Sequence, residues 1–299
     1  NPQEPTKEQL QSLINLYTQS QYQQALSQAS QLLKEFSNSV TLYNIIGVVT
    51  QRLGRLKDAN QAFKNAISIM PNYVDAYYNL GNTLVEQGIL DEAIQAYTKA
   101  ISVRPDYVDA HNNLGSVFKR QGKIEKAIQA YTKAISIKPD YAEAYNNMGI
   151  ALKGTIFTKP NRDLQKTIVS LLNKETYIRP KYIDKAAISL LKLEPTLQKQ
   201  LKVVDDGIIQ NPTDVISELN EFPLLLKLMS VCPLPDLELE KLFQQLRASI
   251  LENFSSLEKA SPELLRFQSA LALQCFTNEY IYSQTEEETK ILQSLEARV

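Results

Sequence analysis

The apolar and polar positions in the first half of the chain repeat every 34 residues. Small, aromatic and proline residues return at the same step as the apolar ones: Gly47, Gly81 and Gly115; Ala59, Ala93 and Ala127; Phe63, Tyr97 and Tyr131; and Pro71, Pro105 and Pro139. A fixed period of this kind is typical of a solenoid, whose units cannot bury their apolar faces alone and therefore stack on one another.

Each unit is predicted to hold two helices. In two successive units the pattern places them at 74–87 and 91–104, and at 108–121 and 125–138. Gly88 closes the first helix and Pro105 ends the second, because proline lacks the N–H that a helix interior needs. Gly81 lies inside a helix, where glycine costs about 1 kcal/mol relative to alanine. We therefore expect the paired helix to approach closely there, with Ala93 on its side of the contact.

The repeats are expected to fill residues 1–154. The units are a degenerate repeat at 6–39, repeats at 40–73, 74–107 and 108–141, and a partial repeat at 142–154. Thr6 and Gln9 form a capping-box pattern that opens the first helix. The 34-residue register is lost over 154–160, so we place the end of the solenoid there.

Residues 155–299 are expected to form a helical cap domain that buries the open end of the last repeat. Apolar residues at three-and-four spacing predict helices at 161–174, 180–193, 195–204, 212–220, 222–230, 235–254, 262–283 and 286–297. A capping box over 285–288 opens the last of these helices. No alternating run rich in β-branched residues predicts a strand, so the expected fold class is all-α.

The repeats resemble the tetratricopeptide repeat (TPR) family. The residues that carry the resemblance in one unit are Tyr77, Leu80, Gly81, Gly88, Ala93, Tyr97, Ala100 and Pro105. Tyrosine stands where the family has tryptophan, and His111, the only histidine, takes that place in one unit. The resemblance implies antiparallel helix pairs stacked in a right-handed superhelix, an α-solenoid whose concave face is lined by the first helices. We expect His111 to be a packing side chain.

Composition excludes several classes of protein. The 299 residues are 43% hydrophobic and 22% charged with a net charge of -1, which is ordinary for a globular protein and does not suggest a nucleic-acid partner. No apolar run is long enough to span a membrane, and the first residues lack the features of a signal peptide, so a cytoplasmic location is the default expectation. The start at Asn1 and the helical pattern at the other end indicate a piece of a longer protein.

The sequence offers little catalytic chemistry. Seven of the nine glycines occupy repeat positions, so no glycine-rich loop for a nucleotide can be drawn from them. Cys232 and Cys275 are far apart and the chain has one histidine, which leaves no metal-ligand spacing. We expect both cysteines in the core, no cofactor, and no enzymatic activity of this chain.

A second resemblance concerns residues beyond the repeats. Segments at 157–161, 177–180, 190–192 and 271–280 are similar to stretches of bacterial TPR proteins that continue into a class I S-adenosylmethionine-dependent methyltransferase domain. This resemblance implies that the chain is the non-catalytic, targeting half of such a protein, and that a catalytic domain follows Val299.

A row of asparagines is the candidate binding site. Asn79, Asn113 and Asn147 recur 34 residues apart on the first helices, at a position that in the TPR family commonly faces the concave groove. Side-chain amides pair with both the N–H and the C=O of an extended peptide, and the row resembles the asparagine ladder of O-linked N-acetylglucosamine transferases. Three further asparagines add polar groups nearby: Asn82, Asn112 and Asn146. The alternative is that all of these residues only keep the repeats soluble.

Four basic residues gather around one turn: Lys119, Arg120, Lys123 and Lys126. As a patch they would attract acidic ligands, and the alternative is ordinary solvated charge. The expected function is a scaffold that binds a protein or an extended peptide in the groove, without nucleic-acid or membrane partners. A structural protein that forms homo-oligomers through a solenoid end or the cap helices is a further alternative.

Overall fold

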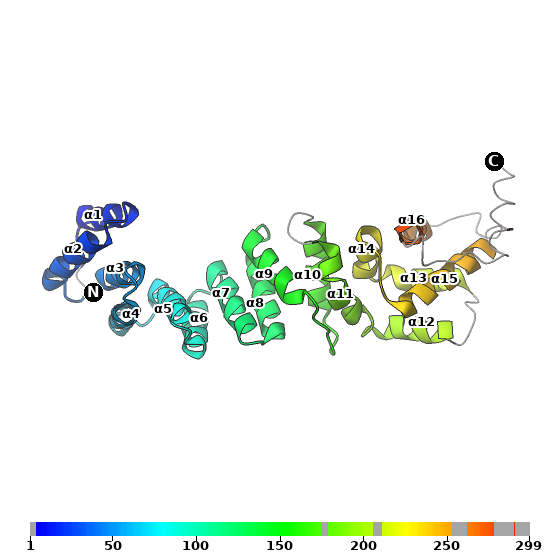
Figure 1. The fold of residues 1–299 in the computed structure, drawn as a ribbon, viewed down its shortest axis with the longest axis horizontal. Helices are drawn as coiled ribbons and strands as arrows, with labels where there is room; N and C mark the ends of the chain where they lie inside the picture. The colour runs from blue at the N-terminus through cyan, green and yellow to red at the C-terminus, as the bar shows by residue number, and fades with distance from the viewer. Residues whose placement is uncertain (1–3, 175–178, 206–210, 253–261, 278–289, 291–299) are drawn as a thin grey trace. The chain divides into compact units, whose positions relative to one another are not determined.

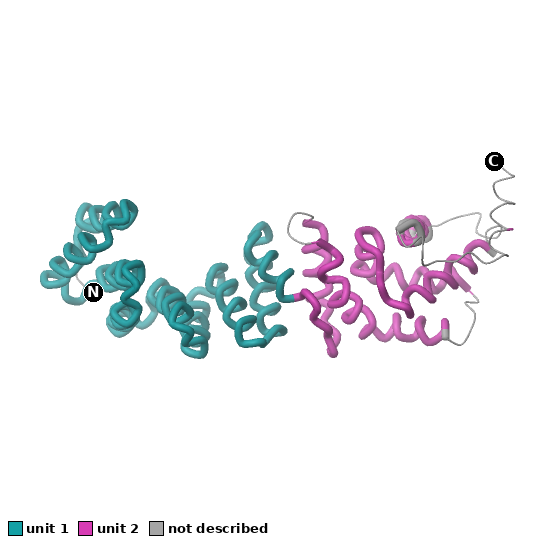
Figure 2. Tube along the Cα trace, in the orientation of Figure 1, with its two compact units in different colours: residues 1–151 teal, residues 152–299 magenta. Residues whose placement is uncertain are grey.

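A computed structural model of the chain describes residues 4–174, 179–205, 211–252, 262–277 and 290. All regular secondary structure in these ranges is helical, which confirms the all-α fold class (Figure 1). The chain divides into two compact units, residues 1–151 and residues 152–299 (Figure 2).

Unit 1 is a series of helix pairs. Its helices are α1 (Lys7–Thr18), α2 (Tyr22–Glu35), α3 (Val40–Arg52), α4 (Leu56–Ile69), α5 (Val74–Glu86), α6 (Leu90–Val103), α7 (Val108–Arg120), α8 (Ile124–Ile137) and α9 (Ala142–Leu152). The bounds of α5 to α8 agree with the predicted ones to within a residue. The predicted capping box opens α1: the Thr6 hydroxyl accepts from the N–H of Gln9, and the Gln9 side chain accepts from the N–H of Thr6.

The helices of unit 1 pack on their neighbours along the chain. Within a repeat, α3 packs on α4, α5 on α6 and α7 on α8, and between repeats α4 packs on α5 and α6 on α7. The first helices also contact one another, α3 with α5 and α5 with α7. Successive first helices therefore line a common face of unit 1, as the stack of pairs in Figure 1 shows.

A close contact at Gly81 joins the two helices of one repeat. A Cβ at this position would lie 2.6 Å from Cε1 of Tyr97, whose side chain is 1% exposed. The equivalent glycine of the repeat on either side meets an equivalent aromatic ring. The predicted close approach is confirmed, and the three atoms nearest to the added Cβ belong to the ring of Tyr97 on the second helix. Ala93 lies in the same buried cluster as Tyr97. Gly88, just after α5, has a φ of +78°, a backbone conformation that favours glycine.

Unit 2 is helical but does not repeat. Its elements are α10 (Arg162–Asn173), the 3₁₀ turn η1 (Pro180–Tyr182), α11 (Asp184–Leu191), α12 (Pro195–Asp205), α13 (Pro212–Asn220), α14 (Pro223–Val231), α15 (Leu237–Glu252) and α16 (Pro262–Thr277). A single helix over 180–193 is a wrong prediction, because Ile183 leaves the helical backbone with φ -118° and ψ 3°. The predicted helix at 286–297 and its capping box, like residues 278–283 of the helix before it, lie outside the described residues.

A buried amide fastens α16 to the end of α14. Nε2 of Gln274 donates to the carbonyls of Met229 and Cys232, both at 2.7 Å, and its Oε1 accepts from the N–H of Leu234 at 3.2 Å. The Cys232 thiol is buried and free, as expected of a core cysteine, whereas the side chain of Cys275 lies outside the described residues. That unit 2 caps the last repeat stays a prediction.

Candidate functional site

A groove crosses the first helices of unit 1. It holds a cavity of ≈ 460 Å³ lined by residues of α1, α3, α5 and α7, together with Tyr97 of α6. Asn79, Asn82 and Asn113 are among the lining residues. The structure thus brings together three of the six asparagines that the sequence singles out.

The asparagine row forms hydrogen bonds from one repeat to the next. Nδ2 of Asn79 donates to Oδ1 of Asn44 at 3.0 Å, and Nδ2 of Asn113 donates to the hydroxyl of Tyr78 at 3.2 Å. In each pair the donor lies 35 residues after the acceptor. The row is therefore part of what joins neighbouring first helices, a role that neither reading of the sequence considered.

The other three asparagines do not line this cavity. Nδ2 of Asn147 donates to Oδ1 of Asn112 at 3.0 Å, again 35 residues away. Asn112 is fully buried and donates to Oε1 of Glu143 at 2.8 Å, so both ends of its amide are engaged within the protein. Asn146 is exposed on α9. A ligand in the cavity would therefore meet none of these three side chains.

Asn82 is the centre of the polar network in the groove. Its Oδ1 accepts from Nδ2 of Asn113 at 3.0 Å and from the Tyr97 hydroxyl at 2.7 Å. Burial raises the pKa of Tyr97, so the hydroxyl keeps its proton and remains a donor to Asn82. The orientation of the Asn82 amide is thus fixed, with its carbonyl oxygen held by two protein donors.

Three charged residues share the groove with the asparagines. Arg52, Glu86 and Arg120 are the last residues of α3, α5 and α7, and all three line the cavity. Arg120 belongs to the predicted basic cluster, but sequence reasoning missed the other two. The sequence does contain a pattern that could have identified them, because the three charged positions follow the same 34-residue step as the asparagines. The hydroxyl of Tyr17 accepts from Nε of Arg52 at 2.9 Å, and this bond raises the pKa of Arg52.

The remaining residues of the basic cluster make local contacts. Nζ of Lys123 donates to Oε1 of Gln121 at 2.7 Å, and Nζ of Lys126 lies 5.8 Å from the centre of the Phe118 ring. Lys119 is half-buried on α7. Only Arg120 of the four lines the groove. An acidic ligand drawn to the whole cluster stays a prediction.

The single histidine has a structural environment. The side chain of His111 is buried, and its Nε2 lies 2.9 Å from the carbonyl oxygen of Pro105 in the turn before α7. In the next repeat Tyr145 holds the same position and its hydroxyl donates to the carbonyl of Pro139 at 3.2 Å. A polar ring tip at this position therefore fastens the turn that leads into α7 and the turn that leads into α9.

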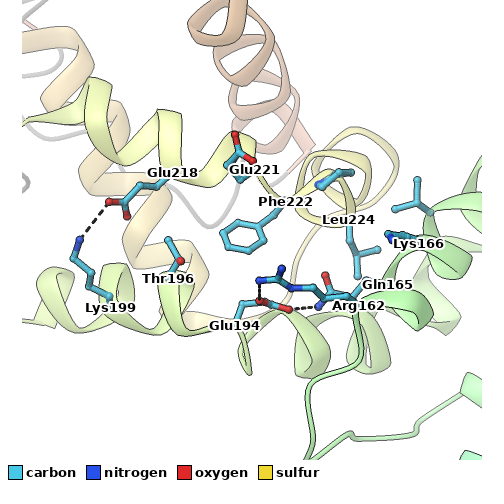
Figure 3. Close-up of a pocket in the computed structure, with 12 residues that line it drawn as sticks. Arg162, Gln165, Lys166, Glu194, Thr196, Lys199, Glu218, Glu221, Phe222 and Leu224 are labelled. Carbon is cyan, nitrogen blue, oxygen red and sulfur yellow. Dashed lines mark hydrogen bonds and ion pairs between the residues drawn. The ribbon is translucent and has the colours of Figure 1, made fainter.

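A second hollow, of ≈ 570 Å³, lies within unit 2 (Figure 3). Its buried carboxylate, Glu194, sits between α11 and α12 and points toward Arg162 and Gln165 of α10. Nε2 of Gln165 donates to one oxygen of Glu194 at 2.8 Å, and Nη2 of Arg162 lies 3.4 Å from the other. The carboxylate is therefore paired, and these contacts join α10 to the start of α12.

Within the described ranges the structure offers no metal site, since no three side chains of histidine, cysteine, aspartate or glutamate gather there. None of the helices in those ranges is long and apolar enough to cross a membrane.

Comparison with known proteins gives distant likenesses among solved structures, and no curated protein matches. The crystal structure of MamA shares 29% identity over 54% of this chain and 92% of that one, with a TM-score of 0.47. MamA 41-end from Desulfovibrio magneticus RS-1 shares 18% identity over 57% and 94% of the two chains, with a TM-score of 0.47. YrrB, a TPR protein with an unusual peptide-binding site, shares 19% identity over 60% and 89%, with a TM-score of 0.45.

The repeats themselves match a family model described as TPR repeat. The match covers residues 51–88, 81–122 and 115–155, in three overlapping copies. These copies include α5 and α7, which carry the three asparagines of the groove. Residues 51–155 of the chain are therefore tetratricopeptide repeats, as the resemblance of the sequence implies.

Proposed function

We propose that the chain is a protein-interaction scaffold that binds an extended peptide in the groove of unit 1. The observation that carries the proposal is the set of amides, Asn79, Asn82 and Asn113, that lines one open cavity on neighbouring first helices. An extended backbone displays a donor and an acceptor at each residue, and side-chain amides satisfy both without requiring a particular sequence.

The bonds between repeats decide which amide atoms are available to a ligand. Both N–H groups of Asn113 are engaged, one by Tyr78 and one by Asn82, and one N–H of Asn79 is engaged by Asn44. Burial raises the pKa of Tyr78, and an interaction of its hydroxyl with Nδ2 of Asn82 partly opposes this rise, while the second N–H of Asn82 has no partner among the described residues. In the same ranges no hydrogen bond ends on Oδ1 of Asn79 or Oδ1 of Asn113. The groove therefore presents two acceptors, Oδ1 of Asn79 and of Asn113, and one remaining N–H on each of Asn79 and Asn82, which suits the N–H and C=O groups of a peptide.

Substituting Asn82→Asp separates binding from folding. Aspartate keeps an oxygen to accept from Tyr97 and Asn113, but it loses the Nδ2 donor that would bind a peptide carbonyl. Alanine at Asn79 would be a poorer test, because it also removes a bond between repeats. The matched control is Asn65→Asp, which adds the same charge on α4, away from the residues that line the groove.

The assay is fluorescence anisotropy with a library of labelled, uncharged extended peptides on the full chain. For peptides that bind the wild type, we expect Asn82→Asp to lower the affinity about three- to tenfold, the equivalent of one lost hydrogen bond. Asn65→Asp should leave the affinity unchanged. Circular dichroism should show the same helicity for both variants. Equal affinity in the wild type, Asn82→Asp and Asn65→Asp would show that the groove amides do not hold the peptide.

A further inference from the structure

The charges in the groove alternate along the repeats. Arg52, Glu86 and Arg120 occupy the same position of three successive repeats and are exposed at the ends of α3, α5 and α7. Read along the array, the groove therefore presents a positive, a negative and a positive group, one for each first helix. The three residues line the cavity that also holds the asparagines.

Neutral partners hold these charged groups in place. Each is bonded to the preceding repeat, 35 residues earlier: Arg52 to the Tyr17 hydroxyl at 2.9 Å, Glu86 to the Gln51 amide at 2.6 Å, and Arg120 to the Val85 carbonyl at 3.3 Å. In the part of the chain that the structure describes, no ion pair includes any of the three. The bonds orient the side chains without cancelling their charges, and both guanidinium groups retain further N–H donors.

The spacing of the first helices sets the spacing of the charges. Packed helices lie about 8–10 Å apart, and α3 contacts α5 as α5 contacts α7. A polyproline II chain rises 3.1 Å per residue with three residues per turn, so every third side chain returns to the same side after about 9 Å. A β-strand would send residues three apart to opposite faces. A polyproline II peptide along the groove therefore matches the step from one charge to the next.

We propose that the groove selects a polyproline II peptide with an acidic residue, a basic residue and a second acidic residue at every third position. The acidic side chains pair with Arg52 and Arg120, and the basic one pairs with Glu86. The pattern is the same in both directions, so it fits whichever way the peptide runs. A polyproline II backbone makes no internal hydrogen bonds and leaves its polar groups for the asparagines. The inference rests on the proposed function and names the partner of the same groove.

Three labelled seven-residue peptides test the charge pattern. The matched peptide has glutamate at both ends, lysine in the middle, and two prolines between each charge. The inverted peptide exchanges glutamate and lysine, and the shifted peptide has the composition of the matched one with its three charged residues adjacent. By fluorescence anisotropy at low salt on the full chain, we expect the matched peptide to bind about tenfold more tightly than the inverted one, since each exposed pair contributes a modest attraction.

Two charge reversals test the assignment of residues. Glu86→Arg makes the groove positive at all three positions, so its preference should move from the matched peptide to one with glutamate at all three charged positions. Arg120→Glu should weaken the matched peptide at one end. The control Glu92→Arg carries the same change as the first variant, but it lies on α6 away from the groove and should keep the wild-type preference.

The outcomes distinguish this inference from the proposed function. If matched, inverted and shifted peptides bind equally, and Asn82→Asp weakens all of them, the charge selection is wrong while the groove function stands. If Glu86→Arg and Glu92→Arg show the same preference among the peptides, Glu86 does not contact the basic residue of the peptide and the assignment is overturned. If no peptide of either library binds, both proposals fail together.

Discussion

Substituting Gly81→Ala should strain the contact between α5 and α6. The added Cβ would lie 2.6, 2.8 and 2.9 Å from three carbons of the Tyr97 ring, all shorter than ordinary contact. The ring has little room to move, because the side chain is 1% exposed and its hydroxyl is bonded to Asn82. Either the ring or the helix must shift, and the shift would also disturb the amide at the centre of the groove.

Two opposing terms set the size of the effect. Overpacking a core destabilises the folded state by about 1–3 kcal/mol. Replacing glycine by alanine inside a helix stabilises it by about 1 kcal/mol. With the ring fixed at both ends we expect the packing cost to be in the upper part of its range. Gly81→Ala should therefore lower the free energy of unfolding by about 1–2 kcal/mol.

A double-mutant cycle with Tyr97→Leu isolates the contact. Leucine lacks the ring atoms that the new Cβ would meet, so in that background Gly81→Ala should be neutral or stabilise by up to about 1 kcal/mol. Urea unfolding followed by circular dichroism gives the four free energies. Native-state amide exchange should accompany it, because repeat arrays can unfold in parts.

Gly88→Ala is the control for this cycle. Its φ of +78° is strained for alanine, but no atom lies within 4 Å of the added Cβ. Its cost of about 1–2 kcal/mol should therefore be the same with Tyr97 or leucine in the ring position. If Gly81→Ala destabilises equally in both backgrounds, or stabilises the wild type, the ring is not what requires glycine at that position.

Three further substitutions probe buried polar groups, each measured by urea unfolding. Asn112→Ala should cost about 1–3 kcal/mol because it removes a fully buried amide and the donor that Glu143 accepts from; an unchanged midpoint would contradict that role. Glu194→Ala should cost a similar amount through its lost bonds in unit 2, and no loss would mean that the pairing is only incidental. Burial raises the pKa of Cys232 from 9.0 to about 11, so the unfolded thiol loses its proton first and its contribution to stability falls as pH rises through this range. The slope should become smaller in Cys232→Ala, and the part that remains belongs to buried tyrosines such as Tyr97, whose pKa burial also raises. An unchanged slope would contradict the role of Cys232.

Much of the fold follows from local rules that the sequence displays. The 34-residue step placed α5 to α8 to within a residue, because Gly88 and Pro105 mark helix ends by backbone chemistry alone. The split of the predicted helix at 180–193 was not visible, because the backbone of Ile183 is set by its tertiary surroundings rather than by a proline or glycine. Where an element's limits are set by packing, the apolar pattern gives its existence but not its bounds.

The candidate site was predictable in position but not in bonding. The register located Asn79 and Asn113 on first helices, yet their partners Asn44 and Tyr78 depend on how neighbouring helices are offset, which no spacing rule gives. The charge of Glu86 was missed for a different reason. A search for clusters of one sign overlooks a row whose sign alternates, even when its period is the same.

The hydrogen bonds between residues 35 apart in the sequence also imply how such a groove can change length. Among the described residues, none of the groove's hydrogen bonds reaches beyond an adjoining repeat. A tandem duplication of residues 74–107 would therefore keep every bond, because the copy of Asn79 would donate to the original Tyr78 as Asn113 does now. Each such duplication would add one first helix and make room for about three more residues of a bound chain. An insertion that is not a whole number of 34-residue repeats would break the offset at its junction, so the recognised peptide can lengthen only by about three residues at a time.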